Sequence, residues 1–175
     1  DIKGCDNAIA AVAAARQLNP GSSVVKASAT KLPYAKESFD LVCAISVIEH
    51  LTEAQAEKFL SETVRVLKPQ AFVFLVTPNF ATPIRKIQGK KWFGYSDPTH
   101  INFFTPKSLQ KLLEKHQFGN FKLTFPINYR SSLDWEFHPP LVNLPRLIKR
   151  FLMYLLFTSP FFTIRNSLWI LAQKK

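Results

Sequence analysis

The feature of this 175-residue sequence that most constrains its fold is an alternation of short apolar runs with helical periods. Continuous apolar runs at 41–45 and 71–76 predict strands that are buried in a parallel sheet. Between them, residues 52–67 place apolar side chains at helical spacing, and Thr52 with Gln55 forms a capping-box pattern. Strand, helix and strand in this order predict a βαβ unit, and therefore an α/β fold.

The chain opens with a similar unit. Residues 1–5 predict the end of one strand and residues 24–27 predict another. Apolar residues at helical spacing lie between them, and Asn19, Pro20 and Gly21 end that helix.

In the C-terminal half the order of predicted elements changes to one helix followed by two strands. Thr105 followed by Pro106 predicts a helix start, and Gly119 follows the expected end of that helix. Two final strands are expected at 122–129 and 167–173, the second of them antiparallel to its neighbours.

The chain length fits a single domain, 1–175, with an apolar insertion at about 139–162. The uncharged stretch in this insertion is shorter than the roughly 20 residues that a membrane-spanning helix needs. Residues 141–162, with basic side chains at Arg146 and Lys149, could make peripheral membrane contact. A lid or a dimer contact over the active site is the alternative.

The charge balance is basic, with 23 Lys and Arg against 12 Asp and Glu and a formal net charge of +11. Such a charge attracts phosphates, nucleic acid or an anionic bilayer. The basic residues are scattered and form no tail, so we do not expect a nucleic-acid partner. Two cysteines, Cys5 and Cys43, make no disulfide framework, and a cytoplasmic location is expected.

Four segments in order add a family resemblance: ASATKLPY at 27–34, SFDLV at 38–42, VIEHL at 47–51 and VRVLKP at 64–69. They resemble consecutive signatures of class I S-adenosylmethionine (SAM)-dependent methyltransferases. The resemblance is closest to the small-molecule branch that contains ubiquinone-pathway and saccharide or lipid methyltransferases. It implies a Rossmann-like three-layer α/β sandwich with a mostly parallel sheet, and SAM as the cofactor.

Candidate cofactor-binding residues follow the predicted strands. A carboxylate at Asp6, at the end of a strand, could accept hydrogen bonds from both ribose hydroxyls, or it could cap the next helix. The resemblance implies that Asp6 binds the ribose and that Ser28 and Ala29 lie beside the adenine. It also implies that Ile45 and Ser46 lie under the methionine part of SAM.

One family feature is absent from the sequence. The family holds SAM with a GxGxG turn after its first strand, where the backbone must approach the ligand closely. None of the five glycines here forms even a G-x-G pair, so we expect the first strand and this loop in residues that precede Asp1. The alternative is a non-catalytic Rossmann-like binding domain that lacks the loop. A nicotinamide-dependent dehydrogenase shares the ribose-binding acid but not the four segments.

Two histidines are the candidate catalytic residues. His100 lies in SDPTHINFF, which resembles a family segment reading Asp-x-x-His followed by aromatics, and a neutral imidazole could take the proton of an acceptor hydroxyl. The alternative is a loop histidine bonded to Asp97. The nearby aromatic residues, including Trp92 and Tyr95, could wall an acceptor pocket or belong to the core.

His50 follows Glu49, and it could orient substrate or pack at a helix start. Some ubiquinone-pathway relatives bind a divalent metal through a Glu-His pair and a glutamate three residues earlier. That earlier position is Ser46 here, and two adjacent ligands alone make a poor metal site, so we expect no metal.

The predicted reaction is SAM-dependent methyl transfer to an oxygen of a small-molecule, saccharide or lipid-linked acceptor. Besides the inert binding domain, a nucleic-acid methyltransferase is an alternative because of the charge of +11.

Overall fold

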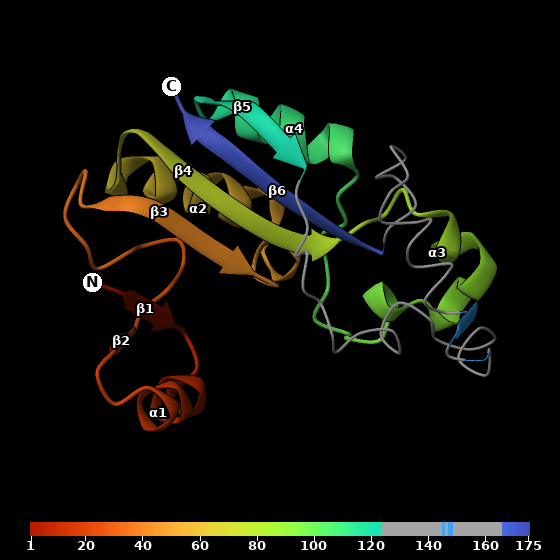
Figure 1. Ribbon diagram of the computed structural model, residues 1–175, viewed down its shortest axis with the longest axis horizontal. Helices are drawn as coiled ribbons and strands as arrows, with labels where there is room; N and C mark the ends of the chain where they lie inside the picture. The colour runs from red at the N-terminus through yellow and green to blue at the C-terminus, as the bar shows by residue number, and fades with distance from the viewer. Residues whose placement is uncertain (124–144, 146, 149–165) are drawn as a thin grey trace.

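The computed structural model describes residues 1–123, 145, 147–148 and 166–175, and their strands form two sheets (Figure 1). The smaller sheet pairs two strands in parallel: β1 (Lys3–Asp6) and β2 (Ser23–Lys26). The larger sheet has the order β3-β4-β6-β5: β3 (Phe39–Ile45), β4 (Leu67–Pro78), β6 (Ser167–Lys174) and β5 (Phe118–Leu123). β3 and β4 are parallel, whereas β6 is antiparallel to both of its neighbours, as the sequence predicted.

The helices and helical turns connect these strands in the expected alternation: α1 (Ile9–Leu18), η1 (Ile48–His50), α2 (Glu53–Val66), α3 (Pro83–Gln88), η2 (Gly89–Lys91), η3 (Phe93–Tyr95) and α4 (Pro106–Lys115). The molecule therefore has the predicted Rossmann-like α/β fold. The break between the two sheets falls between β1 and β3, which share no ladder pairs.

Local sequence signals set both ends of α2. The capping box predicted from Thr52 and Gln55 is present in full at its start. At its end the Lys174 ammonium donates to the carbonyls of Val64 (2.8 Å) and Leu67 (2.6 Å). A cation at this end complements the helix dipole and satisfies carbonyls that the helix itself leaves without partners.

The core lies between the four-stranded sheet and helices α2 and α4. Leu60 of α2, Leu109 of α4 and Leu75 of β4 all belong to it and have no exposed surface. The opposite face of β3 remains exposed at Leu41 (48%) and Ile45 (61%). The prediction that 41–45 is buried on both faces is therefore wrong for the described residues, because α1 packs on the β1–β2 pair instead.

The turn after α4 also differs from the prediction. Gly119 does not end the helix but lies inside β5, which begins at Phe118 and not at 122. The left-handed turn residue is Gln117, with φ of 64°. A glutamine in this conformation costs about 1–2 kcal/mol relative to right-handed backbone, so sequence patterns place glycine there by default.

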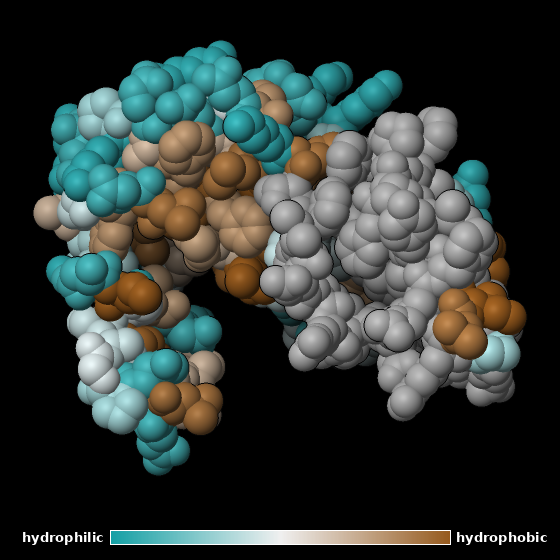
Figure 2. Space-filling model, viewed as in Figure 1, coloured by the Kyte–Doolittle hydropathy of each residue, from teal (hydrophilic) through white to brown (hydrophobic). Residues whose placement is uncertain are grey.

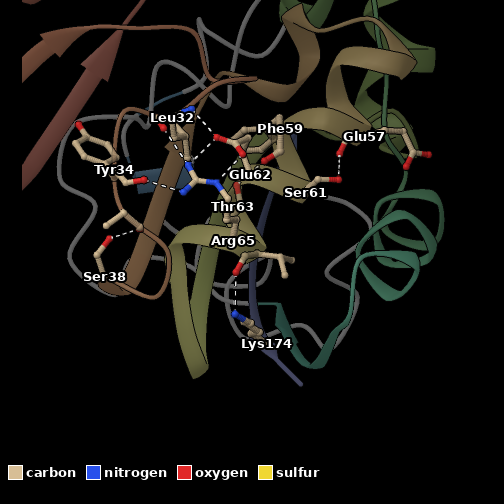
Figure 3. A network of polar contacts seen from close by, with 12 residues as sticks. Leu32, Tyr34, Ser38, Glu57, Phe59, Ser61, Glu62, Thr63, Arg65 and Lys174 are labelled. Atoms are coloured by element: carbon tan, nitrogen blue, oxygen red, sulfur yellow. Dashed lines mark hydrogen bonds and ion pairs between the residues drawn. The ribbon is translucent and has the colours of Figure 1, made fainter.

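A polar clamp connects the two sheets through the segment 31–38 (Figure 3). The Arg65 guanidinium donates to the carbonyls of Leu32 (3.0 Å) and Tyr34 (2.8 Å) and binds both carboxylate oxygens of Glu62. Glu62 in turn accepts the backbone N–H of Leu32. The Tyr34 hydroxyl donates to the carbonyl of Gly4 in β1 at 2.8 Å, so the clamp reaches from α2 to the smaller sheet.

Replacing Arg65 by methionine should lower the free energy of unfolding by about 1.5–3 kcal/mol, because two carbonyls and a carboxylate lose charge-assisted partners. Lys68→Met is the matched control. Its ion pair with Asp40 is equally short at 2.8 Å but more exposed, and its loss should cost less than about 1 kcal/mol. Urea unfolding of both variants measures the difference, and equal destabilisation would contradict a structural role for the clamp.

Candidate functional site

The candidate site lies where the strands of both sheets end. The arrowheads of β1, β3 and β4 point the same way in Figure 1, so the segments that follow these strands share one edge of the molecule. Asp6 ends β1, and Ser46 follows β3 directly. Open α/β sheets bind ligands at this carboxyl edge.

Asp6 offers one carboxylate oxygen to a ligand. Its side chain is exposed, and Oδ1 accepts the backbone N–H of Ala8 at 2.7 Å. Ala8 is the N-cap position of α1, so Asp6 holds the turn before the helix without being its cap residue. Oδ2 has no hydrogen-bond partner within the described part of the chain.

Ser28 and Ala29 lie in the loop after β2. Ser28 is exposed, and its hydroxyl lies 2.8 Å from the Thr30 hydroxyl and accepts the Thr30 N–H. Ala29 is half-buried and packs against the main core. The structure thus leaves the outer face of Ser28 open and uses Ala29 partly for packing.

Ile45 and Ser46 mark the end of β3. Ile45 is 61% exposed, and Ser46 has a φ of 52°, in the left-handed region that serine rarely adopts. The Ser46 N–H donates to the Val76 carbonyl of β4 at 2.9 Å, which holds this conformation in place. Figure 2 shows a recess beside the lobe of α1, β1 and β2, with apolar residues along the part of the surface above it. Exposed polar and apolar side chains therefore lie at the same edge, a combination that ligand-binding sites use.

His100 is held by a backbone carbonyl. Its Nδ1 lies 2.8 Å from the Gly94 oxygen, and a carbonyl only accepts, so Nδ1 carries a proton and the neutral ring has its lone pair on Nε2. The Asp97 carboxylate does not bond this imidazole; it accepts the N–H and the hydroxyl of Thr99 instead. His100 is bonded to Asp97 through the backbone, because its N–H donates to the Asp97 carbonyl at 3.1 Å. The alternative of a loop histidine bonded to Asp97 therefore holds for the backbone and not for the two side chains.

His50 lies beside His100, with ring centroids 4.7 Å apart. Its Nδ1 is 2.8 Å from the Thr99 hydroxyl, whose own proton is donated to Asp97 at 2.6 Å. Both hydrogen bonds from Thr99 keep the pKa of Asp97 below its usual value, so Asp97 stays an ionised acceptor. The Thr99 oxygen must then accept from His50, which places the proton on Nδ1 of His50 as well.

Glu49 is the residue of this cluster that the predicted site omitted. Its side chain has no exposed surface, and neither carboxylate oxygen has a hydrogen-bond partner in the described part of the chain. One ligand atom each from Glu49, His50 and His100 lies within 4.8 Å of the others. The expectation of no metal rested on two adjacent ligands, and the structure brings in a third from a distant loop.

The predicted aromatic group divides between a separate cluster and the core. Trp92 is fully buried and makes ring contacts with Phe80, Phe93, Tyr95 and Phe103. Its indole N–H donates to Asn166, and Phe104 belongs to the main core. Tyr95, at the edge of this cluster, keeps 39% of its surface exposed.

Gly94 connects this aromatic cluster to His100. A Cβ atom on Gly94 would lie 2.2 Å from the Trp92 ring, which no side chain tolerates. The same glycine supplies the carbonyl that orients the His100 imidazole. Close contact between backbone and indole therefore sets the position of the histidine.

The apolar insertion at 139–162 lies almost entirely outside the described residues. Among the helices that are described, none has the length and apolar character to cross a bilayer.

The Gly94→Ala variant should lose about 1–3 kcal/mol of stability, because the added methyl group overpacks the Trp92 contact. Gly21→Ala is the control, since no atom lies within 4 Å of a Cβ at that position. Thermal unfolding measures stability, and the NMR signals of the His100 ring report its environment. An unshifted His100 spectrum in a folded Gly94→Ala variant would contradict the positioning role of Gly94.

Comparison with known proteins finds similar methyltransferases both by sequence and by structure. A family model described as a methyltransferase domain matches residues 1–75. A tRNA (carboxymethyluridine(34)-5-O)-methyltransferase of Arabidopsis thaliana is 37% identical over 90 residues, which are 45% of this chain and 22% of that protein. A ubiquinone biosynthesis O-methyltransferase of Bartonella bacilliformis is 30% identical over 92 residues, 49% of this chain and 36% of that protein. The chain thus spans about a fifth to a third of the length of these relatives.

Solved structures share the fold over nearly all of the chain. A SAM-dependent methyltransferase from Thermotoga maritima superposes with a TM-score of 0.68 at 20% identity, covering 99% of this chain and 72% of that one. Another from Archaeoglobus fulgidus gives 0.63 at 20% identity, covering 98% and 75%. At this identity the likeness establishes the fold.

Proposed function

Because residues 1–75 belong to the methyltransferase domain family and the chain has the class I methyltransferase fold, we propose that the protein transfers a methyl group from SAM to an oxygen atom. The observation that carries this proposal is a pair of imidazoles, in the segments that follow β3 and β4, whose Nδ1 atoms are bonded to Thr99 and to the Gly94 carbonyl, so that in the neutral rings Nε2 can accept a proton. An oxygen acceptor is supported by the two curated relatives, which are both named as O-methyltransferases.

In this proposal the edge formed by β1, β2 and β3 binds the cofactor. The free oxygen of Asp6 accepts hydrogen bonds from the ribose, Ser28 and Ala29 border the adenine, and Ile45 and Ser46 contact the methionine part. When bound, SAM supplies a methyl group on a positively charged sulfur, which is an excellent leaving group. The protein therefore contributes mainly alignment and the exclusion of water.

The histidines act on the acceptor side. As the acceptor oxygen bonds to the methyl carbon and the carbon–sulfur bond breaks, the hydroxyl proton passes to Nε2 of His100. The hydrogen bond from Nδ1 to the Gly94 carbonyl orients the ring for this transfer. His50, oriented by Thr99, borders the same space and positions the acceptor.

We infer a small-molecule, saccharide or lipid-linked acceptor, as in the ubiquinone relative. A tRNA acceptor is the second candidate, favoured by the Arabidopsis relative and by the net charge of +11. Incubating the protein from its whole reading frame with methyl-labelled SAM and separated lipid, saccharide and tRNA fractions distinguishes the two. Label in tRNA alone would overturn the first candidate, and label in no fraction would overturn both.

Asp6→Ala should weaken SAM binding by about tenfold or more, because charge-assisted hydrogen bonds to the ribose are lost. Asp6→Asn keeps an acceptor for the Ala8 N–H and should lose less affinity. Asp40→Asn is the control, since Asp40 is exposed near the opposite end of β3. Calorimetric titration with SAM measures the dissociation constant of each of the three variants and of the wild type. Wild-type affinity in Asp6→Ala would remove Asp6 from the site.

His100→Gln should lower turnover by roughly 10²- to 10⁴-fold, the range for losing a positioned proton acceptor. The residues proposed to bind SAM lie on other segments, so SAM affinity should stay close to that of the wild type. His116→Gln is the control, because His116 contacts Glu57 of α2 and has no part in this site. Wild-type turnover in His100→Gln, measured on the labelled fraction, would eliminate His100 as the base.

A further inference from the structure

The cluster of Glu49, His50 and His100 combines a buried carboxylate with two histidines, and methyl transfer by itself does not require such a combination. We propose that these three side chains form a binding site for one divalent transition-metal ion. The resemblance to metal-binding relatives would place a ligand at position 46, which is serine here. The third ligand comes instead from the loop after β4, more than fifty positions away along the chain.

The buried carboxylate of Glu49 is the first reason. It has no exposed surface, and both of its oxygens lack a hydrogen-bond partner among the residues that the structure describes. None of the ion pairs formed by those residues includes Glu49. An isolated buried carboxylate costs several kcal/mol, and a bound cation offsets this cost directly.

The proton positions on the two histidines are the second reason. His50 donates from Nδ1 to Thr99, and His100 donates from Nδ1 to the Gly94 carbonyl. With Nδ1 donating, Nε2 is the nitrogen that a neutral ring can offer to a metal. Metal-bound histidines in proteins almost always donate their other nitrogen to a carbonyl, a carboxylate or a similar acceptor.

Backbone hydrogen bonds also hold the segments of the cluster together without a metal. The carbonyl of Glu49 accepts the N–H groups of Ile101 and Asn102, both at 3.0 Å, so the His100 loop is attached to the helical turn that carries Glu49 and His50. One carboxylate oxygen of Glu49 and one ring nitrogen of each histidine already lie within 4.8 Å of one another. A metal with bonds of about 2.1 Å holds its ligands roughly 3–4 Å apart, so a closing movement of about 1 Å completes the site.

The ligand types select the class of metal. Two imidazoles and one carboxylate suit Zn²⁺, Fe²⁺, Co²⁺ or Mn²⁺, whereas Mg²⁺ and Ca²⁺ prefer oxygen ligands. Three protein ligands leave at least one coordination position open. If the proposed methyl transfer is correct, that position fits the acceptor oxygen. With the metal bound, His100 would be a ligand and no longer the base, and the ion would promote loss of the acceptor proton instead. The site itself rests on the geometry alone.

Cobalt binding tests the site without SAM or acceptor. The whole protein, stripped of metal with a chelator, is titrated with Co²⁺ while its visible absorption is recorded. We expect one Co²⁺ per chain with the bands of a four- or five-coordinate ion, and a higher melting temperature in its presence. Glu49→Gln and His100→Ala should each abolish both effects.

Two further variants separate ligand loss from misfolding. Thr99→Val removes the acceptor that orients His50 but lies on the surface, so the protein should fold and bind Co²⁺ about 10- to 100-fold more weakly. His116→Gln, which removes a histidine in contact with another glutamate, should bind Co²⁺ as the wild type does.

The proposal is overturned if the wild type binds no Co²⁺, or if folded Glu49→Gln and His100→Ala variants bind it unchanged. Equal loss in His116→Gln would also overturn it, because binding would then be general to histidines. Cobalt binding by a protein that labels no acceptor fraction would contradict the proposed function and leave the metal site intact.

Discussion

The arrangement of the two sheets depends on the hydrogen bonds that the Arg65 guanidinium donates. It binds two carbonyls of the segment between β2 and β3, and the tyrosine of that segment bonds the backbone of β1. β1 and β3 share no backbone ladder, so side-chain contacts of this kind set their relation. The position of Asp6 relative to the end of β3 therefore follows from a cation on α2, far from either residue in the sequence.

Glu49 organises the other half of the site in a comparable way. Its backbone carbonyl holds the loop that carries His100, while its buried carboxylate lies close to both imidazoles and has no hydrogen-bond partner among the described residues. A structure that serves packing alone gains nothing from a buried carboxyl group that lacks a hydrogen-bond partner. The energetic cost of burying this carboxyl group is compatible with a site that a bound ligand completes. With Nδ1 of each histidine bonded elsewhere, the Nε2 atoms remain available to the same ligand.

The elements that the sequence predicted well depend on neighbouring residues. The capping box of Thr52 and Gln55 needs only a spacing of three, and the strands at 41–45 and 71–76 follow from continuous apolar runs. The burial of each face of a strand cannot be predicted from neighbouring residues in this way, because it depends on which helices pack on that face. Leu41 and Ile45 are apolar in either case, and only the placement of α1, α2 and α4 leaves them exposed.

The sequence by itself determined the α/β alternation, the methyltransferase signatures and the location of Asp6 at a strand end, because each is a short-range pattern. It also singled out His50 and His100, but as separate candidates. Only the tertiary structure decided that they meet at Glu49, since their contact requires the segments after β3 and β4 to converge at one sheet edge. Parallel pairing of strands that are distant in the sequence brings such residues together. The distance between two such side chains therefore cannot be predicted from their local sequence spacing.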